Sequence, residues 1–184
     1  LKALSEVNLR MGELKDAKAN ALEALSIARN TYRPTSSQAT EAKCQLAKVY
    51  LAQGSVDKAL IRLNTMEASL ERSADIQDIL RAQVQFLLGE ACRMSDDFDK
   101  SIDHYEQALQ LLTNRTDSEI LLKADVYRGL GDLYSSRARK DDRKAEAFYL
   151  NALMTMLRSD EREEAKVLTI VSNLSTMFRQ KQNT

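Results

Sequence analysis

A small residue returns along this 184-residue chain at nearly constant spacing. Ala17, Ala59, Ser101 and Ala145 are separated by 42, 42 and 44 residues. The positions around them repeat as well, and the best-filled copy consists of Leu88, Gly89, Cys92, Ser101, Tyr105 and Ala108. Such a period indicates a stack of similar units, because one unit cannot bury its apolar faces without a neighbour.

Other stretches fill the same positions to different degrees. An upstream copy has identical offsets and consists of Leu46, Ala47, Tyr50, Ala59, Leu63 and Met66. A weaker first copy consists of Leu4, Ser5, Asn8, Ala17, Ala21 and Ala24, and the fourth, with two extra residues, of Leu130, Gly131, Tyr134, Ala145, Tyr149 and Ala152. Leu174, Ser175 and Phe178 form a half copy. We therefore predict a single array over residues 1–184, divided into a weak or truncated repeat 1–33, repeats 34–73, 74–115 and 116–158, and a terminal helix 159–184.

Each copy is predicted to be a pair of helices joined by a turn. Five glycines and one proline leave few helix breakers, and the commonest residues are strong helix formers. Turn residues lie between the paired helices at Gly12, Gly54 and Asp96–Asp97, and Pro34 marks a junction between pairs. Because small side chains let two helices approach closely, we expect the repeating small residues to lie at helix contacts.

The charge composition argues against a binder of nucleic acid or of membranes. The 27 basic and 27 acidic residues cancel, so the chain has no overall field that would attract either. No apolar run approaches the roughly 20 residues that span a bilayer. The first residue is Leu1, which suggests a fragment of a longer chain.

The chain also lacks the residues for a catalytic or metal site. His104 is the only histidine, so neither a histidine-based catalytic pair nor a histidine metal pair can form. Cys44 and Cys92 are too few for a disulfide framework and are expected to be packing residues in a reducing compartment. We predict no enzyme activity, no cofactor and no metal, and a cytoplasmic or nuclear location.

The repeating pattern resembles the tetratricopeptide repeat family. Its usual period is about 34 residues, and the longer period found here is similar to that of kinesin light chain arrays. The resemblance implies an all-α fold, a right-handed α-solenoid of stacked antiparallel helix pairs. It also implies a scaffold or adaptor that binds a peptide or helix of a partner protein in a concave groove lined by the first helix of each pair.

The resemblance places particular residues on that groove. The groove positions of the five copies hold Lys2, Glu6, Glu41, Cys44, Lys48, Gln83, Phe86, Glu90, Arg93, Asp125, Arg128, Asp132, Ser135, Thr169, Ser172, Asn173 and Thr176. The predicted peptide-binding residues are Lys48, Phe86, Glu90, Arg93, Asp125, Arg128, Asp132 and Asn173. Phe86 has two interpretations, a contact for the peptide or packing against the preceding pair.

Two other functions stay open at this point. The chain could be an architectural part of a large assembly, such as a ubiquitin-ligase or cell-division scaffold, that binds through its convex faces and terminal helix. That alternative is favoured by a predicted exposed apolar face on the last helix, formed by Leu168, Val171, Leu174 and Met177, which could contact further repeats or another end. RNA binding is a third, because helical repeats also occur in RNA readers.

Overall fold

The computed structural model describes residues 1–71, 77–113, 116–136, 140–160 and 164–182, with side chains up to residue 179. Within these ranges the regular structure is α-helical, which confirms the predicted fold class. The helices are α1 (Lys2–Arg10), α2 (Leu14–Thr31), α3 (Ser37–Ala52), α4 (Val56–Leu70), α5 (Asp78–Met94), α6 (Phe98–Leu111), α7 (Asp117–Ser135), α8 (Asp142–Met156) and α9 (Glu164–Gln182).

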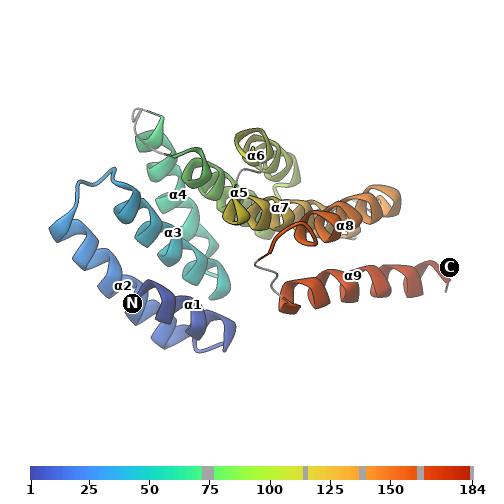
Figure 1. The fold of residues 1–184 in the computed structure, drawn as a ribbon, viewed down its shortest axis with the longest axis horizontal. Helices are drawn as coiled ribbons and strands as arrows, with labels where there is room; N and C mark the ends of the chain where they lie inside the picture. The colour runs from blue at the N-terminus through green and yellow to red at the C-terminus, as the bar shows by residue number, and fades with distance from the viewer. Residues whose placement is uncertain (72–76, 114–115, 137–139, 161–163, 183–184) are drawn as a thin grey trace. The chain divides into compact units, whose positions relative to one another are not determined.

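The chain divides into two compact units, Leu1–Asp97 with α1 to α5 and Phe98–Thr184 with α6 to α9 (Figure 1). In each unit, every helix packs against the next one along the chain. The first helices of the predicted pairs also pack against each other, α1 on α3, α3 on α5, and α7 on α9. Each unit therefore has a layer of first helices, as stacked helix pairs require.

The turns inside the first three pairs share one backbone geometry. Gly12, Gly54 and Asp96 have φ angles of 77°, 69° and 59° and lie 42 residues apart. In each turn the next residue's N–H bonds a carbonyl five residues earlier, at 2.8, 2.8 and 2.9 Å. This is a Schellman motif, which satisfies carbonyls at the helix end and needs a left-handed residue. The backbone conformation of these turns therefore repeats every 42 residues, as the side-chain pattern does.

The repeating small residues lie where helices meet. Ala17, Ala59, Ser101 and Ala145 are all completely buried, as expected from their positions in the pattern. A close approach occurs at Gly131 on α7, where a Cβ atom would lie 2.6 Å from the ring of Tyr149 on α8. Glycine is required there because a side chain would overlap a buried ring.

Two junctions between pairs carry side-chain helix caps. The Ser36 hydroxyl accepts from the N–H of Ala39, and the Thr116 hydroxyl from the N–H of Glu119, each at 3.2 Å. These bonds satisfy N–H groups that have no partner inside their own helix. Residues 72–76, 114–115 and 161–163, at or near predicted repeat boundaries, lie outside the described part of the chain. The division between the units falls at 97/98, within the predicted repeat 74–115.

The core of the second unit corrects the prediction for the last helix. Leu174 and Met177 are buried with Ile170 in a cluster that includes Tyr149 and Met156. Leu168 and Val171 are exposed by 68 % and 41 %. The prediction of one exposed apolar face was therefore wrong for Leu174 and Met177, because the helix turns these two side chains toward α7 and α8.

We expect the Cys44 thiol to be inert in the folded protein. Burial, the largest cause, raises its pKa to about 12. The thiolate is the reactive form, so its fraction at pH 8 falls far below that of an unfolded cysteine, whose pKa is about 8.5. In a Cys92→Ala background, Ellman's reagent should react at least about a hundredfold more slowly with the native chain than with the urea-unfolded chain. Equal rates would contradict the burial of Cys44.

Candidate functional site

Three of the predicted site residues share one face of α7. Asp125, Arg128 and Asp132 are spaced three and four positions apart, which aligns them along a helix. Arg128 Nη1 donates to Asp132 Oδ2 at 2.6 Å, and its Nε lies 4.0 Å from Asp125 Oδ1. Their side chains are 17 to 22 % exposed, so the face is desolvated in part but open to a ligand.

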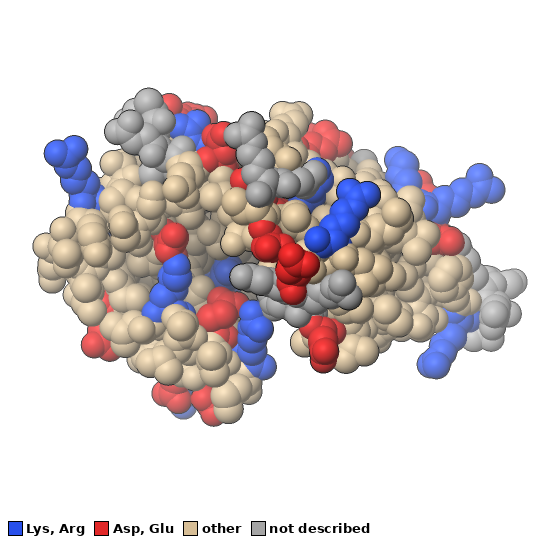
Figure 2. Space-filling view, in the orientation of Figure 1, with Lys and Arg blue, Asp and Glu red and all other residues tan. Residues whose placement is uncertain are grey.

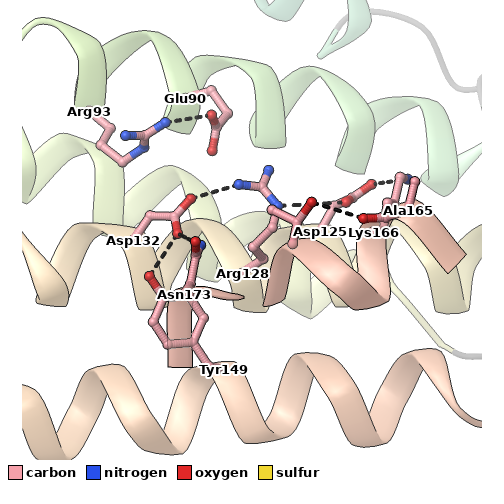
Figure 3. A network of polar contacts seen from close by, with 10 residues as sticks. Glu90, Arg93, Asp125, Arg128, Asp132, Tyr149, Ala165, Lys166 and Asn173 are labelled. Carbon is pink, nitrogen blue, oxygen red and sulfur yellow. Dashed lines mark hydrogen bonds and ion pairs between the residues drawn. The ribbon is translucent and has the colours of Figure 1, made fainter. Parts of the chain in front are cut away.

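Two side chains of α9 complete this face. Lys166 Nζ lies 2.7 Å from Asp125 Oδ2, and Asn173 Nδ2 donates to Asp132 Oδ1 at 2.9 Å. Both pairs are 41 residues apart, close to one repeat period. From α8, the Tyr149 hydroxyl donates to the same Asp132 oxygen at 2.8 Å (Figure 3). We call these six residues, Asp125, Arg128, Asp132, Tyr149, Lys166 and Asn173, the α7–α9 network.

Asp132 is the centre of the network. Its carboxylate accepts from Arg128, Tyr149 and Asn173, one donor from each of three helices. Burial, and after it the Asp132 carboxylate, raise the pKa of Tyr149 well above the usual value of about 10. The phenol therefore stays protonated and keeps donating at physiological pH.

The stability of the chain is expected to depend on Tyr149 at alkaline pH. The unfolded phenol loses its proton near pH 10 while the folded one keeps it, so the free energy of unfolding falls as pH rises above 10. This group alone contributes a slope of up to about 1.4 kcal/mol per pH unit. Urea denaturation at pH 8.5 to 11 should show a shallower decline for Tyr149→Phe than for the wild type. Both proteins carry Cys44, so the difference isolates Tyr149, and parallel curves would contradict the assignment.

In the first unit the predicted residue Lys48 also pairs with the neighbouring first helix. Its Nζ lies 3.6 Å from Glu6 Oε2 on α1, and Lys2 of α1 forms an ion pair with Glu41 of α3. The charges on this face thus neutralise one another across a repeat, as they do between α7 and α9. Such half-exposed pairs contribute little to stability.

The predicted binding residues of α5 include an ion pair and a buried aromatic side chain. Glu90 and Arg93 form an ion pair of 2.8 Å within the helix (Figure 3). Phe86 is only 8 % exposed, which favours its packing role over contact with a ligand. Cys44, also on the list of groove positions, is buried.

The sequence predictions missed two members of the network. Tyr149 belongs to the fourth copy of the pattern but not to its groove positions, yet its hydroxyl reaches the polar face. Lys166 was not singled out because it does not occupy a groove position of the pattern. Its positive charge and its sequence separation of 41 residues from Asp125 are the signal that could have identified it. Opposite charges about one period apart become neighbours when the repeats stack.

The charge pattern of the surface agrees with the composition. Basic and acidic side chains are mixed over the visible face, with no large area of one sign (Figure 2). Within the described ranges, no helix is both long enough and apolar enough to cross a bilayer. The same residues bring no three His, Cys, Asp or Glu side chains together as a metal site.

Comparisons with known proteins give a family match for part of the chain and a similar fold for most of it. The tetratricopeptide repeat family model matches residues 78–156, which agrees with the resemblance seen in the sequence. The crystal structure of BtubC (BKLC) from P. vanneervenii is similar in fold, with a TM-score of 0.69 at 20 % sequence identity. The match covers 96 % of this chain and 69 % of BtubC. No curated protein sequence matches the chain significantly.

Proposed function

We propose that this chain, whose residues 78–156 are tetratricopeptide repeats, is a non-catalytic module that binds a segment of a partner protein. Repeats of this family generally mediate contacts between proteins. The proposed binding face is the α7–α9 network, where four of the predicted residues meet. Lys48, Glu90 and Arg93 are proposed as further contacts on their own helices. Phe86 is left out because it is buried.

The observation that carries this proposal is the geometry of Asn173. Its amide nitrogen donates to Asp132, which fixes the orientation of the side chain. No described residue donates to its Oδ1, although an amide oxygen can accept two hydrogen bonds. Asn173 can therefore accept from a backbone N–H of an extended peptide without losing its contact to Asp132.

The charge balance of the network predicts how such a ligand is recognised. Two carboxylates, Asp125 and Asp132, face two cations, Arg128 and Lys166. A balanced face gives no strong attraction to a peptide of either sign. We therefore expect binding through hydrogen bonds and shape, with affinity that changes little as salt screens the charges.

A peptide selection tests the proposal. A random display library is selected on the wild-type chain, and each selected peptide is then measured against Asp132→Asn. The substitution removes the charge that orients Arg128, Tyr149 and Asn173, so peptides held by the network should bind at least about tenfold more weakly, a loss of about 1.4 kcal/mol. Selected peptides that all keep their affinity would contradict this binding face.

An architectural role is a second candidate, and α9 favours it. Leu168, Val171 and Phe178 are exposed by 68, 41 and 44 % and are spaced three and seven positions apart, near one face of the helix. Such a face can associate with another protein surface. Light scattering should then show association of the wild type at high concentration and a monomer for Leu168→Glu. A monomer in both cases would leave peptide binding as the function.

A further inference from the structure

The first unit has a pocket away from the layer of first-helix contacts. It has a volume of about 380 Å³ and is formed by α2, α3 and α4. The residues that line it are Arg29, Lys43, Leu46, Tyr50, Lys58, Ile61, Arg62, Thr65, Met66 and Ser69. We call it the basic pocket, because four of these residues are cationic and none is acidic.

The cations of the basic pocket are poorly compensated. Arg29, Lys58 and Arg62 form no ion pair with any described residue. Lys43 Nζ donates to the carbonyl of Pro34 at 2.6 Å, which is a neutral partner. Burial, followed by the charge of Arg29, lowers the pKa of Lys43. The pocket thus holds positive charges that repel one another and pair with no carboxylate of the described residues.

The floor of the basic pocket is apolar and aromatic. Leu46, Tyr50 and Met66 are buried at its base. The Arg62 guanidinium lies 5.4 Å from the centre of the Tyr50 ring, within the range of a cation–π contact. This contact holds a cation above an apolar surface, an arrangement that suits a ligand with both an anionic and an apolar part.

The equivalent positions of the second unit show that this charge is not a property of every repeat. Tyr127 precedes Tyr134 by seven residues, as Lys43 precedes Tyr50, and Phe148 follows Ala145 by three, as Arg62 follows Ala59. Phe148 stacks on both tyrosine rings, with centroids 6.4 and 5.6 Å apart. Aromatic rings therefore fill the place that the two cations occupy between α3 and α4.

A pocket of similar volume also lies on α7 and α8, nearer the start of α7 and the end of α8. It is lined by Ile120, Lys123, Tyr127, Asn151, Met154, Thr155 and Arg158, so it has two cations where the basic pocket has four. The first unit therefore carries the stronger positive site of the two.

We propose that the basic pocket binds an acidic segment of a partner protein. Carboxylates of the segment pair with Arg29, Lys43, Lys58 and Arg62, and one apolar side chain packs on the floor formed by Tyr50 and Met66. The apolar floor and the volume favour such a segment over a lone inorganic anion, which would use only the charges. This site is separate from the α7–α9 network, so the chain would hold two ligands or two parts of one partner.

The test measures fluorescence anisotropy with a defined probe, a fluorescein-labelled peptide that has one leucine flanked on each side by two glutamates. Arg62→Gln and Lys43→Glu should each weaken binding at least about tenfold, since each removes a cation from the pocket. The matched control is Lys15→Glu, an exposed cation of α2 outside the pocket, which should change the affinity less than about twofold. Thermal melting establishes whether each variant is folded. If Lys43→Glu is unfolded, the test relies on Arg62→Gln alone.

Further arms separate this proposal from the alternatives. Replacing the glutamates of the probe by glutamine, or its leucine by serine, should weaken binding, and added salt should weaken it steeply. Asn173→Ala should have no effect, so failure of the α7–α9 network leaves this result intact. The proposal is overturned if Lys15→Glu weakens binding as much as Arg62→Gln, if the glutamine probe binds equally well, or if a uridine oligonucleotide binds more tightly than the acidic probe.

Discussion

Replacing Gly131 by alanine is expected to destabilise the α7–α9 core by about 2 to 3 kcal/mol. The new Cβ would lie 2.6 Å from two atoms of the Tyr149 ring. The ring cannot simply move aside, because it is buried and its hydroxyl is bonded to Asp132. The loss occurs although alanine is intrinsically the better helix former by about 1 kcal/mol.

A double-mutant cycle isolates that contact. In a Tyr149→Ala background the space beside Gly131 is open, so the same Gly131→Ala change should be neutral or stabilising by up to about 1 kcal/mol. Free energies of unfolding from urea denaturation give the four corners of the cycle. If Gly131→Ala costs as much in the Tyr149→Ala background as in the wild type, the ring is not what excludes a side chain.

Replacing Ala145 by leucine is expected to cost about 1 to 3 kcal/mol. Ala145 is completely buried on α8 within the cluster that contains Tyr149, Met156 and Ile170. Three extra carbon atoms there must displace well-packed neighbours. The matched control is Ala147→Leu on the same helix, where the side chain is exposed and little change is expected.

The test compares the melting temperatures of Ala145→Leu and Ala147→Leu with that of the wild type. A clear drop for Ala145→Leu beside an unchanged Ala147→Leu would support the placement of the small residue at the helix contact. Equal melting temperatures for Ala145→Leu and the wild type would mean that the repeat alignment is wrong at this position.

The helix pairs could be predicted from the sequence because period and residue size act together. The small residues Ala59, Ser101 and Ala145 recur at the spacing of the repeat and are fully buried. The turn residues Gly12 and Gly54 recur at the same spacing and adopt the left-handed conformation. At each of these positions the size or the backbone conformation of the residue is what matters, and both can be read from the residue type.

The candidate site could be predicted only in part. Asp125, Arg128 and Asp132 share a face by helical spacing, which the sequence contains. Their contacts to Lys166 and Tyr149 depend on how α8 and α9 pack on α7. That packing cannot be predicted from a single sequence. For the same reason the burial of Leu174 and Met177 was not foreseen, since their spacing fits either side of α9.

The basic pocket was missed for a different reason. Its four cations come from three helices, and the overall charge of the chain is zero, so neither composition nor a local run of residues reveals them. Only the packing of α2, α3 and α4 brings them together around Tyr50.

Calorimetric titration of one selected peptide into the wild type, Asn173→Ala and Ser175→Ala tests the proposed binding face most directly. Ser175 lies on the same helix, but its hydroxyl bonds only the backbone carbonyl of Val171, so it controls for a general effect on α9. We expect Asn173→Ala to weaken binding at least about tenfold and Ser175→Ala to leave it unchanged. Equal affinities for the wild type and Asn173→Ala, with both proteins folded, would contradict the proposal that this face holds a partner's backbone.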